Sequence, residues 1–171
     1  MESLETRVSA LEQQLAELIA RPDHPAPPAP PAPPSTDTFW ALEGLRAHAA
    51  DFAHGAVLFT GTVDLPTGEH YDWQHGTAVD DLLEADWADS AETLGALGHP
   101  VRLLLLRRVL AGVRTAAELA AEEGFGTTGQ LYHHLRQLVA AGWLRTSGRG
   151  RYAVPGERVV ALLVILSGAR R

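Results

Sequence analysis

The chain has 171 residues, a formal net charge of -7 and no cysteine. This length allows one ordinary domain or two small ones, and the lack of cysteine excludes disulfides, thiolate nucleophiles and cysteine-based metal sites. We see no signal peptide, and the longest apolar stretch, residues 159–166, is far shorter than the roughly 20 residues that span a bilayer. We therefore expect a cytoplasmic protein with no membrane partner.

The negative charge is concentrated in the first half of the chain. Residues 1–90 contain three arginines and 16 acidic residues, a net charge of -13, whereas residues 91–171 contain 11 arginines and five acidic residues, a net charge of +6. A basic C-terminal part is typical of a module that neutralises nucleic-acid phosphates. An uneven surface charge without a function is the alternative.

The first twenty residues carry a heptad pattern. Apolar side chains recur at alternating spacings of four and three, at Leu4, Val8, Leu11, Leu15 and Leu18. Leucine at every d position and valine at one a position favour a parallel dimer. We predict a short coiled-coil helix over residues 1–20, with a single amphipathic helix docked on its own core as the alternative.

A proline-rich linker over residues 21–35 follows, because proline fixes φ and removes hydrogen-bond donors. The next segment, residues 36–89, is acidic and changes its hydrophobic period twice. Within it we predict a helix over 37–50, a β-hairpin with strands 56–63 and 70–75, and a second helix over 78–88.

Residues 90–171 are predicted to form a separate basic domain that completes a mainly α fold with small β-hairpins, an α+β protein. The expected elements are helices over 91–97 and 100–110, a short helix from Thr115, a longer helix from Thr128, and a hairpin around residues 147–150. Thr115 and Glu118 have the spacing of a capping box, and Gly124 is expected to end the short helix. Arg102, Arg107 and Arg108 are expected to face water.

The helix that begins at Thr128 has two contrasting faces. Leu131, Leu135 and Leu138 are spaced to point together into a core. The opposite face is polar and basic, and the hairpin that follows is rich in arginine, so both suit base edges and phosphates. A surface hairpin with solvated arginines is the alternative. The residues predicted to contact DNA are Thr127, Thr128, Gln130, Tyr132, His133, Arg136, Arg145, Arg149 and Arg151.

Residues 97–154 resemble the bacterial ArsR-type winged-helix regulators. The similarity is carried by the opening LGHPVR, the cap TAAEL, the helix YHHLRQL and the hairpin AGWLRTSGRGRY. It implies a winged helix-turn-helix domain and a homodimer that represses transcription by binding double-stranded DNA. In such proteins a terminal helix commonly supplies the dimer contact, and the residues expected to do so here are Val159, Val160, Leu162, Leu163 and Ile165.

The chain departs from that family at the site where metal-responsive members bind their ion, because it has no cysteine. His133 and His134 are neighbours on a helix and point about 100° apart, so we predict no metal site and no cofactor. His133 is expected to face DNA and His134 to pack against the domain. The hairpin residues His70, Tyr71, Trp73 and His75 either line a pocket for an unidentified effector or pack onto the C-terminal domain.

The leading hypothesis is a DNA-binding transcriptional regulator that acts as a dimer or higher oligomer. The alternative is a protein-interaction module that uses the winged helix to bind another regulator. We expect no enzymatic activity, because the chain has no catalytic triad order, phosphate-binding loop, dinucleotide glycine pattern or metalloprotease motif.

Overall fold

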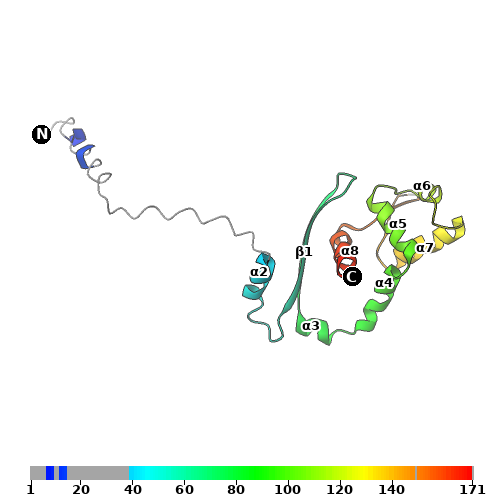
Figure 1. Cartoon of the computed structure of the whole chain (residues 1–171), viewed down its shortest axis with the longest axis horizontal. Coiled ribbons are helices and arrows are strands. Elements are labelled where there is room, and N and C mark those ends of the chain that lie inside the picture. The colour runs from blue at the N-terminus through cyan, green and yellow to red at the C-terminus, as the bar shows by residue number, and fades with distance from the viewer. Residues whose placement is uncertain (1–6, 10–11, 15–38, 149, 171) are drawn as a thin grey trace. The chain divides into compact units, whose positions relative to one another are not determined.

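A computed structural model describes residues 7–9, 12–14, 39–148 and 150–170 (Figure 1). The chain divides into two units, residues 1–40 and 41–171. Residues 7–9 and 12–14 are helical, whereas the rest of the predicted coiled coil and the linker over 21–35 lie outside the described residues. None of the described helices is long and apolar enough to cross a membrane.

The second unit has an α+β fold, with helices and two separate two-stranded antiparallel sheets. Its first elements are α2 (Trp40–His48), β1 (Ala56–Asp64), β2 (His70–Ala78), α3 (Val79–Glu84) and the 3-10 helix η1 (Trp87–Ser90). The predicted hairpin is confirmed, and its second strand runs three residues further than expected because Gly76, Thr77 and Ala78 pair with Leu58, Val57 and Ala56.

The single helix predicted over 78–88 is wrong, because the chain leaves helical geometry at Ala85. That residue has φ -67° and ψ 145°, which is extended backbone. The Asp86 side chain then accepts a hydrogen bond of 2.9 Å from the Ala88 amide and starts η1. An aspartate at this position therefore caps a new element instead of continuing the old one.

The remaining elements follow the predicted order. They are α4 (Ala91–Leu97), α5 (Pro100–Leu110), α6 (Ala116–Ala120), α7 (Thr128–Ala140), β3 (Arg145–Gly148), β4 (Arg151–Ala153) and α8 (Gly156–Gly168). The capping box of Thr115 and Glu118 is confirmed. Gly124 does not end α6, which stops at Ala120; it adopts φ +98° in the turn that leads to α7, where glycine is favoured.

The core of this unit is formed by α4 to α8. Leu131, Leu135 and Leu138 of α7 are at most 1% exposed, as their spacing predicted. They share the core with Leu105 of α5 and with Trp143, whose indole Nε1 donates a 2.7 Å hydrogen bond to the Thr93 carbonyl. The indole nitrogen is therefore satisfied although its ring is buried.

The C-terminal helix α8 is more embedded in its own chain than the sequence indicated. Val159, Val160 and Leu162, three of the five residues expected to contact a second subunit, are buried within this chain. Leu163 and Ile165 remain exposed. The expectation is therefore wrong for the first three residues, because the hydrophobic pattern alone does not distinguish a helix face covered by its own chain from one covered by another.

The hairpin β1–β2 covers part of α8. A Cβ atom placed on Gly61 would lie 2.8 Å from Val160 Cγ1, and one on Gly156 would lie 3.1 Å from the Tyr71 ring. At the hairpin turn, the Arg114 guanidinium donates to the Glu69 carboxylate. The hairpin therefore packs onto the C-terminal part through Tyr71, as one of the two interpretations expected, while Trp73 and His75 remain exposed.

We predict that Gly61→Ala lowers the free energy of unfolding by about 1–3 kcal/mol, because the added methyl group would overlap the stiff, β-branched Val160 side chain. Chemical denaturation of the full chain measures this change. Gly76→Ala on the opposite strand is the matched control, since its Cβ would make an ordinary contact of 3.6 Å with Leu58. Equal stability of the two variants would contradict close packing of β1 on α8.

Candidate nucleic-acid interface

A reciprocal pair of hydrogen bonds starts α7. The Thr127 hydroxyl accepts a 3.3 Å hydrogen bond from the Gln130 amide, and Gln130 Oε1 accepts one of 2.8 Å from the Thr127 amide. This is a capping box, and it satisfies two amides that the helix itself leaves free. The Gln130 carbonyl oxygen thus has a partner within the chain, and the predicted DNA contact of Gln130 stays a prediction for its side-chain NH2 group.

The sequence signal for this cap was present in the spacing of Thr127 and Gln130, the same spacing that identified the cap of α6. Gly126, just before it, adopts φ +75°, and a Cβ there would overlap Gln130 Oε1. Glycine is therefore required for both reasons, since the left-handed conformation and the close approach each disfavour a side chain. The cap fixes where α7 begins and leaves its first turn exposed.

The exposed face of α7 lies opposite its buried leucines. Thr128, Tyr132, His133 and Arg136 are all exposed, and the Tyr132 side chain is not part of the core despite its size. Arg136 forms no ion pair with the carboxylates of the described residues. The helix therefore presents an aromatic ring, an imidazole, a hydroxyl and a guanidinium to solvent, side chains that can hydrogen-bond to base edges or to phosphates.

The hairpin β3–β4 carries the second group of predicted residues. Arg145 pairs in register with Ala153, and Arg151 pairs with Gly148 next to a β-bulge. Both arginines are exposed. Arg149, the third predicted arginine of this hairpin, lies outside the described residues. The two described arginines are thus in position to meet a polyanion, and no ion pair to a described carboxylate competes for them.

This hairpin is anchored to the segment that precedes α6. The Tyr152 amide donates a 2.8 Å hydrogen bond to the Arg114 carbonyl, and Thr115 forms an isolated antiparallel bridge with Arg151. Thr115 is also the N-cap of α6, and α6 packs against α7. The exposed arginines of the hairpin and the exposed face of α7 are therefore connected through α6.

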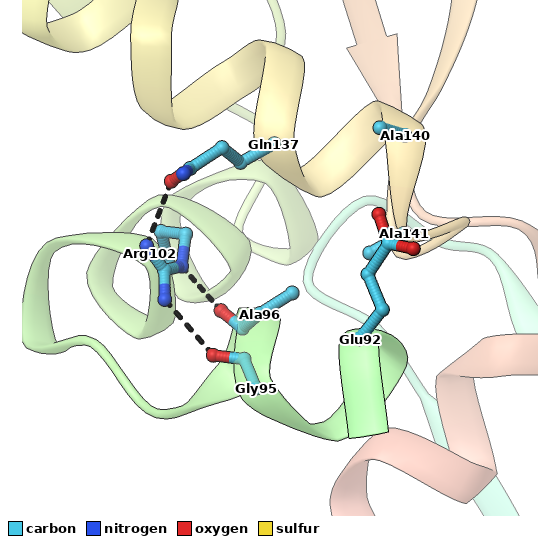
Figure 2. A pocket seen from close by; sticks show the side chains of 7 residues that line it. All are labelled: Glu92, Gly95, Ala96, Arg102, Gln137, Ala140 and Ala141. Carbon is cyan, nitrogen blue, oxygen red and sulfur yellow. Dashed lines mark hydrogen bonds between the residues drawn. The ribbon is translucent and has the colours of Figure 1, made fainter. Parts of the chain in front are cut away.

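Half-buried Arg102 links α7 to α4 (Figure 2). Its NH1 donates a 2.8 Å hydrogen bond to Gln137 Oε1 of α7, and its NH2 donates one of 2.9 Å to the Gly95 carbonyl at the end of α4. Its Nε donates to the Ala96 carbonyl. The expectation that Arg102 faces water is wrong: its guanidinium joins the carbonyl end of one helix to the side of another.

The other two arginines of α5, Arg107 and Arg108, differ in their exposure to solvent. Arg107 is exposed, as expected. Arg108 is half-buried, and its Nε lies 2.7 Å from Glu122 Oε2, in an ion pair whose atoms are not aligned as a hydrogen bond. The spacing of leucine and arginine in the sequence predicts which side of the helix is apolar. It does not show that Glu122, from a later segment, pairs with Arg108.

Three histidines meet where α5 and α7 touch. The ring centroids of His99 and His134 lie 4.6 Å apart, and those of His133 and His134 lie 5.6 Å apart. His99 is the N-cap of α5, where its Nδ1 accepts a 3.2 Å hydrogen bond from the Val101 amide. His134 Nδ1 is buried and has no hydrogen-bond partner among the described residues. His134 packs inward and His133 is exposed, which is the arrangement expected from the sequence.

Burial lowers the pKa of the His134 imidazole, and the charges of His99 and Arg102 lower it further. The charge of His133 acts in the same direction. The described residues contain no group of three or more histidine, aspartate or glutamate side chains placed to hold a metal ion. A proton on His134 would be added beside other basic groups, so protonation of His134 is disfavoured in the folded domain.

Comparison of the chain with protein-family models, with curated proteins and with solved structures finds no match. The resemblance to ArsR-type regulators consequently stays a prediction.

Replacing Arg102 with alanine should lower the free energy of unfolding by about 2–3 kcal/mol, because it removes charge-assisted hydrogen bonds and leaves their acceptors without a donor. Urea denaturation of the full chain measures the change. Arg107→Ala, which removes an exposed arginine from the same helix, should change stability by less than about 0.5 kcal/mol. Equal effects of the two substitutions would show that the Arg102 hydrogen bonds contribute nothing.

The lowered pKa of His134 predicts a loss of stability in mild acid. Below about pH 6.5, the ordinary value for histidine, the unfolded chain binds a proton that folded His134 resists, so the free energy of unfolding falls as the pH falls toward the folded pKa. Denaturation at a series of pH values between 7.5 and 5 should show a shallower dependence for His134→Gln than for the parent chain.

His133→Gln is the matched control for this measurement, since it replaces the exposed neighbour on the same helix. It should keep the pH dependence of the parent chain more closely than His134→Gln does. Exposed His70, whose pKa is raised by hydrogen bonds to Asp64 and Asp72, acts in the opposite sense but is common to all three proteins. The same slope in His134→Gln and the parent would contradict the assignment.

Proposed function

We propose that residues 90–171 form a winged helix-turn-helix domain that binds double-stranded DNA and regulates transcription. In this proposal α6 and α7 are the two helices of the motif, α7 enters the major groove, and the β3–β4 hairpin is the wing that contacts the phosphate backbone. The chain acts as a homodimer that represses its target, as its resemblance to ArsR-type regulators implies. The arrangement of one polar helix face and one arginine-bearing hairpin, joined through α6, supports it best.

The polar face of α7 is the observation that carries the proposal. Three leucines point this helix into the core, and the side chains left outside are mostly hydrogen-bonding ones, with Arg136 as the arginine among them. A solvated helix face on an acidic protein would have no need to exclude acidic residues, yet α7 contains none. Phosphate repels carboxylates and attracts arginine, so this composition fits a surface that approaches DNA.

The order of the elements adds a second argument. A seven-residue segment, 121–127, separates α6 from α7, and it contains Gly124 and Gly126, as glycine is common in the turn of helix-turn-helix motifs. The Thr127 cap leaves the amino end of α7 accessible, and free amides at such an end bind phosphate oxygens. Thr127 and Thr128 are therefore assigned to phosphate contacts, and Tyr132, His133 and Arg136 to the groove.

The wing gives the most direct test. Replacing Arg145 and Arg151 together with alanine should weaken binding to all DNA sequences and reduce the slope of log K against log salt by about 1–2 units, because each lost phosphate contact releases fewer counterions. Fluorescence anisotropy with DNA from upstream of the gene and with random DNA, each at several salt concentrations, measures both quantities. The double variant Arg46→Ala with Arg107→Ala removes the same charge from exposed positions on α2 and α5.

The parent and the control variant should share one affinity and one salt slope. If the wing variant also kept them, the β3–β4 hairpin would have no part in binding. If the parent chain bound neither DNA at any salt concentration, the proposed function would be wrong and a protein-interaction module would take its place.

A further inference from the structure

The C-terminal half of α8 is apolar on sides that its own chain does not cover. The helix carries no charged residue between Arg158 and Arg170. Its first half is buried, but the four residues Leu163–Leu166 each remain 36 to 37% exposed. A helix that is hydrophobic all round is normally buried all round, so this half of α8 needs a cover that the described residues do not provide.

A second set of exposed apolar residues lies on the segment from β1 to α4. In Figure 1 the ribbon of this segment runs around α8, from β1 through α3 to α4. We call residues 56–97, from β1 to α4, the arch. Strands β1 and β2 both contact α8, and α4 lines a groove with it. Within the arch, Trp73, Leu83, Trp87 and Leu94 are between 38 and 69% exposed. Exposed apolar side chains of this size, carried by four successive elements beside α8, are typical of an interaction surface.

Two grooves border the exposed half of α8, the first lined mostly by apolar side chains and the second by both polar and apolar ones. One, of about 530 Å³, lies between α5 and α8 and includes Leu103, Leu163 and Leu166. The other, of about 280 Å³, lies between η1, α4 and α8 and includes Leu94 and Ile165. The exposed half of α8 thus forms a ridge between two grooves. A ridge beside a groove of similar chemistry is what a two-fold interface requires, because each copy offers the same surface to the other.

Charge favours a second copy of this chain over another partner. The apolar stretch of α8 has no charge, so two such helices can meet at a two-fold axis without repulsion. The α3–η1 part of the arch is acidic and exposes Asp81, Glu84 and Asp89, whereas α8 is followed by the exposed Arg170. A helix with apolar sides and a basic end therefore matches a segment that is apolar and acidic.

We infer that the arch and α8 together receive α8 of a second copy, so that the two subunits embrace each other through residues 56–97. This inference rests on the proposed homodimer and assigns it a surface: the acidic segment serves as an arm around the partner's C-terminal helix. It accounts for the exposed tryptophan and leucine side chains of the arch, which neither the wing nor α7 uses.

Disulfide cross-linking tests the arch directly, because the chain has no cysteine of its own. One full-length chain carries Leu83→Cys, and a second, lengthened by a tag, carries Leu166→Cys. After mixing and mild oxidation, a disulfide between chains of different length can form only between two copies. We expect this heterodisulfide in much higher yield than with Leu42→Cys in place of Leu83→Cys, since Leu42 is an exposed leucine of α2 outside the arch.

Sedimentation equilibrium gives the second measurement. Leu83→Glu and Ile165→Glu should each weaken dimerisation more than about tenfold, because a carboxylate would be buried without a partner. Leu42→Glu should leave it unchanged. Leu83 and Leu42 are both exposed, so the glutamate variants at these two positions should keep the far-ultraviolet circular dichroism spectrum of the parent chain, which the same samples can check.

A heterodisulfide above the Leu42→Cys background, together with weakened dimers for both glutamate variants, supports the arch. The inference about the arch is wrong if the parent chain is a monomer. It is also wrong if the dimer forms no heterodisulfide and the two glutamate variants dimerise as the parent does. The apolar surface would then bind another partner. DNA binding is measured separately: salt-dependent binding without the cross-link would leave the proposed function in place and remove only the arch.

Discussion

The burial of one leucine stripe determines what α7 can do. Leu131, Leu135 and Leu138 are fully inside the core, and burying side chains of this size stabilises a domain by about 1.5–3 kcal/mol each. Rotating the helix would expose all three leucines together, so the opposite face is kept toward solvent by the same free energy that folds the domain. Arg102 then fixes the helix along its length through Gln137.

Much of the fold could be predicted from the sequence, because its signals are local. The capping box of Thr115 and Glu118, the starts of α5 at Pro100 and of α7 at Thr128, and the hairpin that begins at Ala56 each depend on a few neighbouring residues. The break at Ala85 was missed because the Asp86 cap, which is equally local, was read as part of a helix face. Local signals thus predict helices and strands well when the hydrogen bonds that each capping residue can make are considered.

Contacts between distant segments could not be predicted in the same way. Arg102 satisfies carbonyls six and seven residues earlier and an amide 35 residues later, and nothing in its own neighbourhood indicates this. Likewise Val160 is covered by Gly61, a residue whose only sequence signal is the lack of a side chain. Of the candidate site, the exposure of Tyr132, His133, Arg136, Arg145 and Arg151 could be anticipated from helical and strand periods, whereas the role of Gln130 in a cap could have been read from its spacing to Thr127 and was not.

The two halves of the chain also differ in charge, and among the described residues an ion pair between Glu69 and Arg114 joins them. Glu69 at the hairpin turn binds Arg114, and that contact lowers the pKa of the Glu69 carboxyl. The next residue, Thr115, pairs with Arg151, and the Arg114 carbonyl accepts from Tyr152. Residues 114 and 115 therefore contact both hairpins. The Arg114 side chain binds the β1–β2 hairpin, and the backbone of residues 114 and 115 binds the β3–β4 hairpin. Any displacement of the first hairpin would shift the base of the second, so the position of Arg151 is mechanically coupled to the acidic half of the molecule.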